Sequence, residues 1–288
     1  MQYFKPASFA EAVALAAGAE GITRILAGGT DVLVQMRSDI VTPDTLIDIK
    51  AIPGTHEIAR TEDGGWRLGV AVTGAEMREH PELGLDWPGV VEAMDLIGST
   101  QVQGRATPVG NLCNASPAAD SVPAMIAAGA RVSITGPEGD RELAVEDIPA
   151  GPGKTTLKKG EIITALILPP RGENGGDAYQ RFIPRTEMDI AVVGCALNLT
   201  VEGDVITSAR MALGAVAPTA VLVHAAADAL VGRTLDEAAL AALSDLAEAS
   251  CNPIDDKRGT IKFRTHVAGV LARRVAQIAY DRAKGAKA

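Results

Sequence analysis

A glycine pair between two regular segments is the first feature that could do chemistry. The sequence reads Ala27-Gly28-Gly29-Thr30-Asp31 after an apolar run, and a helical pattern follows. Two glycines allow a positive φ and a close approach of backbone to ligand, and N–H groups at a helix start suit a phosphate. The spacing matches neither the dinucleotide fingerprint GxGxxG nor a Walker A loop with its lysine. The alternative is an ordinary strand-to-helix turn with Asp31 near the cap.

Small polar residues fill a second segment, which reads ATPVGNLCNASPAAD from 106 to 120. Its hydroxyls, backbone amides and carboxylate would suit an extended ligand with a phosphate at one end and hydroxyls or a ring at the other. The alternative for Asp120 is a plain helix cap. For Cys113 the alternative is a small buried apolar side chain. A catalytic cysteine would need a histidine nearby, and all four histidines (56, 80, 224 and 266) are distant in sequence.

The overall composition excludes several classes of protein. Of 288 residues, 36 are acidic and 27 basic, a net charge of −9, whereas nucleic-acid binding requires a concentrated basic patch. The three cysteines form no CxxC pattern, so a self-contained iron–sulfur or zinc site is not expected. The N-terminus lacks the pattern of a signal peptide, and no stretch reaches the roughly 18 apolar residues of a membrane span. We therefore expect a cytoplasmic protein.

Short strands and helices must position the two loops. The strands are expected at 24–27, 45–49, 66–72, 131–135, 142–145, 162–168, 179–182, 191–201 and 205–213. The helices are expected at 9–17, 32–36, 88–97, 219–230, 235–249 and 261–284, besides a short one after Asp120. Residues 98–119 read as a loop, and a structureless stretch of that length is often functional. The Pro- and Gly-rich run 169–176 is the best domain boundary.

The two loops, together with both ends of the chain, resemble one known family. AGGTD is followed about 80 residues later by QVQGRATPVGNLCNASPAAD; the chain opens with FKPAS, and its tail contains FRTHVAGVLARR. This combination resembles the FAD-binding (medium) subunit of molybdenum hydroxylases. That family includes aerobic carbon monoxide dehydrogenase, xanthine dehydrogenase and 4-hydroxybenzoyl-CoA reductase. The resemblance covers nearly the whole chain.

The resemblance implies an α+β fold with two domains. Residues 1–172 would form a two-lobed FAD-binding domain of the PCMH (vanillyl-alcohol-oxidase-like) type, with lobes at about 1–55 and 56–172 and FAD extended between them. Residues 175–286 would form a C-terminal domain of the carbon monoxide dehydrogenase flavoprotein type. A three-stranded antiparallel sheet and a helical bundle are expected there. The boundary read from the sequence at 169–176 agrees with this division.

Matching positions imply the cofactor site. The FAD diphosphate would be wrapped by Ile25, Leu26, Ala27, Gly28, Gly29, Thr30, Asp31 and Val32. The second phosphate and ribityl contacts would come from Thr107, Pro108, Val109, Gly110 and Asn111. Asp120 matches an acidic position that binds FAD, and Ile97, Ile163 and Arg181 match positions at the adenine or flavin ends. Tyr179 sits where some members place a ring over the isoalloxazine; the alternative is a half-buried strand aromatic.

The function that the resemblance implies is electron transfer. Electrons would pass from 2Fe–2S clusters on a small partner subunit to FAD on this chain, and on to an external acceptor. The molybdenum cofactor would lie on a large partner subunit, and the complex would be a dimer of heterotrimers. No catalytic residue and no metal site is assigned to this chain. The substrate and the acceptor, whether NAD, quinone or oxygen, are not readable from the sequence.

One departure from the family pattern motivates an alternative. The family usually reads T-x-G-G-N in the second loop, whereas Val109 occupies the first glycine position here, and valine disfavours a positive φ. The alternative function is therefore an assembly or scaffold subunit of such a complex, with a weak or vestigial flavin site. A third reading is a stand-alone phosphate-binding enzyme that uses the AGGTD loop, although no nucleophile–base pair can be named for it.

Overall fold

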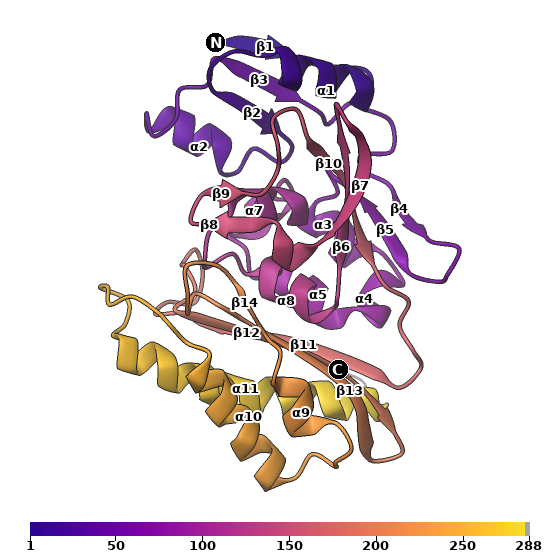
Figure 1. Cartoon of the computed structure of the whole chain (residues 1–288), viewed down its shortest axis with the longest axis vertical. Helices are drawn as coiled ribbons and strands as arrows, with labels where there is room; N and C mark the ends of the chain where they lie inside the picture. Colours follow the sequence, from indigo (N-terminus) through magenta and orange to yellow (C-terminus); the bar gives the residue numbers. More distant parts are fainter. Residues whose placement is uncertain (286–288) are drawn as a thin grey trace.

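The structure, a computed structural model, describes residues 1–285 and has three blocks stacked along its long axis (Figure 1). The first block is a parallel sheet of order β1-β3-β2 with two helices. The helix expected at 9–17 is α1, and Ser8 caps it by accepting a hydrogen bond from the Glu11 amide. The glycine pair follows β2 directly. The bounds are β1 Gln2–Phe4, α1 Phe9–Gly18, β2 Thr23–Leu26, α2 Val32–Arg37 and β3 Thr45–Asp48.

The second block is built on an antiparallel sheet of order β4-β5-β10-β6-β7. The apolar strand β10 lies at its centre, and a register shift falls between Ile163 and Ala165. The strands are β4 Ile58–Arg60, β5 Trp66–Gly69, β6 Arg131–Gly136, β7 Gly139–Ala144 and β10 Ile162–Leu168, besides the small pair β8 Pro149–Gly151 and β9 Lys154–Thr155. The helices are α3 Gly74–Glu79, α4 Leu83–Asp86, α5 Pro88–Asp95, α6 Thr100–Gln103, α7 Pro108–Asn114, α8 Ser121–Ala127 and the 3-10 turn η1 Val145–Asp147.

The third block is an antiparallel sheet of order β11-β12-β13-β14 with helices on one face (Figure 1). Three long strands form the expected sheet, and β14 adds a short fourth strand at its edge. Helix α11 packs on β11 and β12, and α9 packs on β13, around a core of their own. The bounds are β11 Gly175–Phe182, β12 Val193–Glu202, β13 Val205–Gly214, β14 Val221–Val223, α9 Ala226–Leu230, α10 Glu237–Ala249 and α11 Ile261–Ala283.

Helices α5 and α8 of the second block join it to the third. Helix α5 contacts β11, and α8 contacts β12 and β13. The core of the second block accordingly includes Tyr179, Ala196 and Ala212 from the sheet of the third. Apolar burial is the main stabilising term in folding. This shared core therefore fixes how the two blocks sit on one another.

Several predicted elements differ in the structure. The strand expected at 66–72 ends at Gly69, and the strand expected at 179–182 begins at Gly175. The segment 98–119, expected to be a loop, contains the short helices α6 and α7. The helix expected at 219–230 is divided into β14 and α9. Helix α10 begins after Asp236, whose carboxylate accepts from the Ala239 amide, instead of after Thr234.

The predicted domain division at residues 172–175 falls between two sheets. Strand β10 ends at Leu168 in the second block, and β11 begins at Gly175 in the third. We therefore retain the proposed domains 1–172 and 175–286, of which residue 286 lies outside the described part. Across residues 1–285, the helices include none whose length and apolar character would let it cross a membrane.

Candidate functional site

The two predicted loops meet in space, although about 80 residues separate them. Arg105 Nε donates a hydrogen bond to the carbonyl oxygen of Gly28 at 3.1 Å. Asn114 Nδ2 donates to Asp31 Oδ1, also at 3.1 Å. Arg105 lies just before the segment 107–111, and Asn114 lies just after it. The segment 25–32 is thus held against both ends of the segment 107–111.

Both glycines of the first loop are required by the geometry. A Cβ atom on Gly28 would lie 2.0 Å from the carbonyl oxygen of Arg105, far inside van der Waals contact. Gly29 has a φ of +81°, a conformation that L side chains rarely adopt. Asp31 occupies the cap position of α2 but makes no capping hydrogen bond there. Its carboxylate bonds the second loop instead, which disfavours the reading of an ordinary capped turn.

The segment 107–111 of the second loop forms the cap and the first turn of helix α7. The hydroxyl oxygen of Thr107 accepts from the Gly110 amide at 2.9 Å, and Pro108 takes the first helical position, where its missing N–H costs nothing. Val109 lies inside this helix and is only 3% exposed. It needs no positive φ, so the departure from the family pattern does not disturb the backbone. The observation that motivated a vestigial flavin site is thereby removed.

Asp120, Tyr179 and Arg181 form a buried hydrogen-bonded cluster. The Tyr179 hydroxyl donates to Asp120 Oδ1 at 2.7 Å, and Arg181 Nη1 donates to Asp120 Oδ2 at 2.6 Å. Asp120 stands at the cap position of α8, yet its side chain makes no capping bond. The reading of Asp120 as a plain cap is therefore wrong. Its carboxylate instead joins the second block to strand β11.

Burial sets the ionisation of this cluster. Desolvation raises the pKa of Asp120, while the neighbouring Arg181 charge and the two hydrogen bonds act in the opposite direction. Burial, and then the charge of Asp120, hold the pKa of Tyr179 well above its usual value. Tyr179 therefore stays a neutral hydrogen-bond donor at physiological pH. It is 4% exposed, which favours the reading of a buried strand aromatic over a ring free to stack on a flavin.

One polar atom of the cluster is left without a partner. Arg181 Nε is buried and makes no hydrogen bond to any described residue, although its side chain is only 5% exposed. Buried N–H groups are rarely unsatisfied in native proteins. A hydrogen-bond acceptor from outside the chain would satisfy the Nε–H of Arg181.

The other predicted site residues occupy more ordinary positions. Asn111 Oδ1 accepts from the Ser121 hydroxyl at 2.7 Å, which links the second loop to the residue after Asp120. Ile97 is partly buried against the core, and Ile163 is fully packed within it. Desolvation raises the pKa of Cys113 to about 12, so its thiol is not an activated nucleophile.

Arg105 and Asn114 are site residues that the sequence reasoning did not single out. Both lie within the quoted motif, but their roles come from bonds to Gly28 and Asp31, 77 and 83 residues away. Gln35 is a third example, because its amide donates to Asn114 Oδ1 at 3.1 Å. The only sequence signal that could have identified these residues is that they are polar and lie near a recognised loop.

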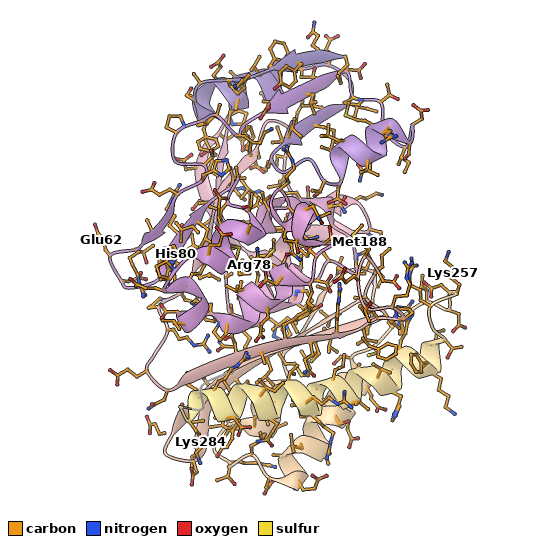
Figure 2. The ribbon with its side chains drawn as sticks, turned by 180° about the vertical axis from the view of Figure 1, so that it is seen from behind. Glu62, Arg78, His80, Met188, Lys257 and Lys284 are labelled. Atoms are coloured by element: carbon orange, nitrogen blue, oxygen red, sulfur yellow. The ribbon has the colours of Figure 1, made fainter. Side chains whose placement is uncertain are left out.

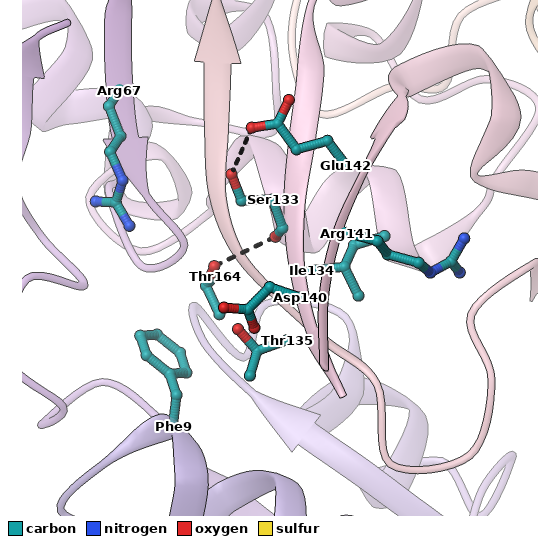
Figure 3. Close-up of a pocket in the computed structure, with 9 residues that line it drawn as sticks. All are labelled: Phe9, Arg67, Ser133, Ile134, Thr135, Asp140, Arg141, Glu142 and Thr164. Carbon is teal, nitrogen blue, oxygen red and sulfur yellow. Dashed lines mark hydrogen bonds between the residues drawn. The ribbon is translucent and has the colours of Figure 1, made fainter. Parts of the chain in front are cut away.

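A cavity of about 480 Å³ lies elsewhere, between Phe9 of α1 and the five-stranded sheet (Figure 3). Its polar lining includes Arg67, Ser133 and Thr164, and the Thr164 hydroxyl donates to the Ser133 carbonyl. None of the predicted flavin-site residues lines it. The candidate site is therefore defined by the meeting of the two loops and by the Asp120 cluster.

Comparison with known proteins gives matches over nearly the whole chain. The FAD binding domain in molybdopterin dehydrogenase matches residues 1–171, and the CO dehydrogenase flavoprotein C-terminal domain matches residues 178–279. The carbon monoxide dehydrogenase medium chain of Afipia carboxidovorans is 34% identical, over 98% of this chain and 97% of that one. The xanthine dehydrogenase FAD-binding subunit of Escherichia coli is 30% identical over the same shares.

A solved structure agrees with the sequence matches. Carbon monoxide dehydrogenase from Hydrogenophaga pseudoflava superimposes with a TM-score of 0.94 at 31% identity, over 98% of both chains. Fold and site thus define a flavoprotein subunit of an oxidoreductase. The chain belongs to the family of FAD-binding subunits of molybdopterin dehydrogenases, and its cofactor is FAD. The buried, unpartnered Arg181 Nε fits such a cofactor, because FAD is rich in hydrogen-bond acceptors.

Proposed function

We propose that the chain holds FAD between its two N-terminal lobes and transfers electrons from 2Fe–2S clusters on a partner subunit to an external acceptor. The observation that carries this proposal is the pair of hydrogen bonds that Arg105 and Asn114, on either side of the segment 107–111, make to Gly28 and Asp31 of the segment 25–32. Two loops from different lobes meet where an extended dinucleotide would bridge the lobes. Bound FAD would supply the redox chemistry, and the protein would supply binding, orientation and tuning.

The residues predicted from the sequence take distinct parts in this proposal. The segments 25–32 and 107–111 would bind the diphosphate and ribityl parts, and Ile97 and Ile163 would contribute apolar contacts toward the ends of the molecule. Asp120, Tyr179 and Arg181 would lie near the isoalloxazine. No side chain is assigned as an acid or base, because electron transfer through a flavin needs none from the protein.

The partners in the proposal are a large subunit with the molybdenum cofactor and a small subunit with the 2Fe–2S clusters, assembled as a dimer of heterotrimers in the cytoplasm. The names "medium chain" and "FAD-binding subunit" of the relatives support a multi-subunit complex. The sequence supports it too, since its three cysteines have no cluster-type spacing.

Purification of the chain tests the proposal. The protein should be yellow, or become so on reconstitution, and should release FAD rather than FMN on denaturation. A chain that stays colourless after incubation with excess FAD would contradict flavin binding. Electron transfer is tested by reducing the partner's clusters in the assembled complex and following flavin bleaching. Clusters that reduce an acceptor equally well with and without bound FAD would overturn the assigned path.

A further inference from the structure

The cavity of about 480 Å³ between α1 and the five-stranded sheet has no part in the proposed function (Figure 3). Its volume lies within the range of about 300–1,000 Å³ that is typical of small-molecule sites. The ring of Phe9 borders it from the first block, and polar side chains border it from the sheet of the second. These polar side chains include Arg67 of β5, Ser133 and Thr135 of β6, Asp140 of β7 and Thr164 of β10. A ligand in this cavity would therefore contact both blocks.

Two charged groups at the cavity, one of each sign, are left without a partner in the chain. The guanidinium of Arg67 and the carboxylate of Asp140 take part in no ion pair or side-chain hydrogen bond among residues 1–285. The other charged side chains of the lining are paired within the chain, as Arg141–Glu161 and Arg131–Glu142. A neutral molecule that carries both charges would compensate both free groups, whereas an anion or a cation would leave one of them unpaired.

An irregularity in β10 places Thr164 at the floor of the cavity. The pairing of β10 with β6 passes from Ile163 to Ala165 without a partner for Thr164. An extra residue of this kind re-aims its side chain and is frequent next to active sites. The Thr164 hydroxyl donates to the Ser133 carbonyl at 3.3 Å, and its oxygen keeps lone pairs that can accept from a ligand. Thr164 is only 7% exposed, so this acceptor lies deep in the cavity.

We infer that the cavity binds a small zwitterion, a free amino acid or a short peptide with an apolar side chain. Arg67 pairs with the carboxylate of the ligand, and Asp140 pairs with its ammonium group. The Thr164 hydroxyl accepts a hydrogen bond from the ligand between these two ends, and the ring of Phe9 covers the apolar side chain. The inference goes beyond the proposed function and requires no FAD.

Isothermal titration calorimetry of the full chain with related probes tests both charges. Free phenylalanine carries both groups, 3-phenylpropionate lacks the ammonium group, and phenethylamine lacks the carboxylate. Phenylalanine should bind saturably and about tenfold more tightly than either analogue. The dipeptide glycyl-phenylalanine carries the same two charges further apart. Tighter binding of the amino acid or of the dipeptide supports the inference in either case and identifies which kind of zwitterion the cavity takes.

Each charged residue should control one of the two preferences. Arg67→Gln should remove the preference for phenylalanine over phenethylamine and keep the preference over 3-phenylpropionate. Asp140→Asn should do the reverse. Glu62→Gln and Lys257→Gln are the matched controls, because each removes an exposed charge that does not line the cavity (Figure 2). Both preferences should be unchanged in these two controls.

The outcomes decide the inference separately from flavin binding. If neither zwitterion binds saturably up to about 10 mM, or if all three phenyl probes bind equally, the site is refuted whether or not the chain holds FAD. Preferences that persist in both Arg67→Gln and Asp140→Asn refute the roles of these residues. If Arg67→Gln does not fold, Asp140→Asn alone decides, because Asp140 is exposed and its substitution removes no buried contact. A chain that takes up no FAD but discriminates the probes as expected keeps this inference and loses the proposed function.

Discussion

At the residue scale, Gly28 lets the two loops of the candidate site approach closely, because it has a hydrogen atom in place of a side chain. The carbonyl oxygen of Arg105 occupies the space that a Cβ would need, and Arg105 Nε bonds the Gly28 carbonyl in turn. The backbone of the first loop is thus pressed against the start of the second. Any side chain at this position must separate the two loops or distort them.

We expect Gly28→Ala to weaken FAD binding at least tenfold and to destabilise the fold by about 1–3 kcal/mol, the usual cost of overpacking. FAD titration monitored by flavin fluorescence and thermal unfolding measure the two effects. Gly18→Ala is the matched control, because nothing lies within 4 Å of its added Cβ at the end of α1; a change within about 0.5 kcal/mol is expected there. Equal FAD affinity in Gly28→Ala and Gly18→Ala would refute the assignment of the first loop.

Strand β11 connects the second and third blocks at the scale of elements. Asp177 lies on this strand, with Oδ1 3.1 Å from Arg171 Nη1. Arg282 of α11 donates to the Asp177 carbonyl at 2.7 Å and to Glu92 of α5. Charged groups of β11, α5 and α11 are therefore packed together where the two blocks join.

The carboxyl group of Asp177 should make the stability of this junction depend on pH. Burial raises its pKa to about 6 from a value near 3.8, despite the opposing charge of Arg171. The folded state thus binds the proton more tightly than the unfolded state. The stability that this difference in proton binding contributes is fully present below pH 4 and is lost as the pH rises to about 6. Asn does not titrate, so the free energy of unfolding of wild type minus that of Asp177→Asn reports on this carboxyl group. Over this pH range that difference should fall by at most about 3 kcal/mol.

Urea unfolding of both proteins at pH 4.5, 5.5 and 6.5 tests this prediction. The variant leaves Arg171 without its carboxylate, so it is expected to be less stable than wild type at neutral pH. The test is therefore how the difference in free energy of unfolding between the two proteins changes with pH, and not its value at any one pH. A difference that stays constant, or grows with pH, would show that Asp177 is ionised throughout.

Periodicity predicted the long elements but could not predict the short ones of the site. Strands β10, β12 and β13 and helices α1 and α11 were predicted within a few residues, because each buries one continuous or periodic apolar face. Helices α6 and α7 have four and seven residues, too few for such a pattern. Ala115 ends α7 with a φ of 50°, where a glycine would have marked the end.

Hydrogen bonds between residues far apart in the sequence cannot be predicted from local sequence patterns. Asp120 has the spacing of a helix cap, and only the tertiary structure brings it to Tyr179 and Arg181, 59 and 61 residues away. The family resemblance identified all three as site residues without indicating that they bond one another. Their assembly depends on the packing of α8 against β12 and β13, which no single segment encodes.

At the scale of the whole molecule, the shared core couples the proposed flavin site to the C-terminal sheet. Helix α8 begins beside Asp120 and packs against β12 and β13, and Arg181 ends the same hydrogen-bonded cluster on β11. A ligand that binds the folded state alone stabilises every part that must unfold with its site, by about 2.7 kcal/mol at 100 times its Kd. FAD should therefore stabilise more than the two lobes that it is proposed to contact.

We expect FAD to slow amide hydrogen exchange in β12 and β13 as well as in the segments 25–32 and 107–111. Exchange followed by mass spectrometry, with and without saturating FAD, measures the effect by segment. Helix α10 is the internal reference, because it packs on α9 and α11 rather than on the helices of the second block. If the C-terminal strands unfold together with the site, their exchange should slow about as much as that of α8. Protection confined to the two loops and α8 would mean that the C-terminal sheet opens independently, and that the shared core positions Arg181 without coupling the stability of the two halves.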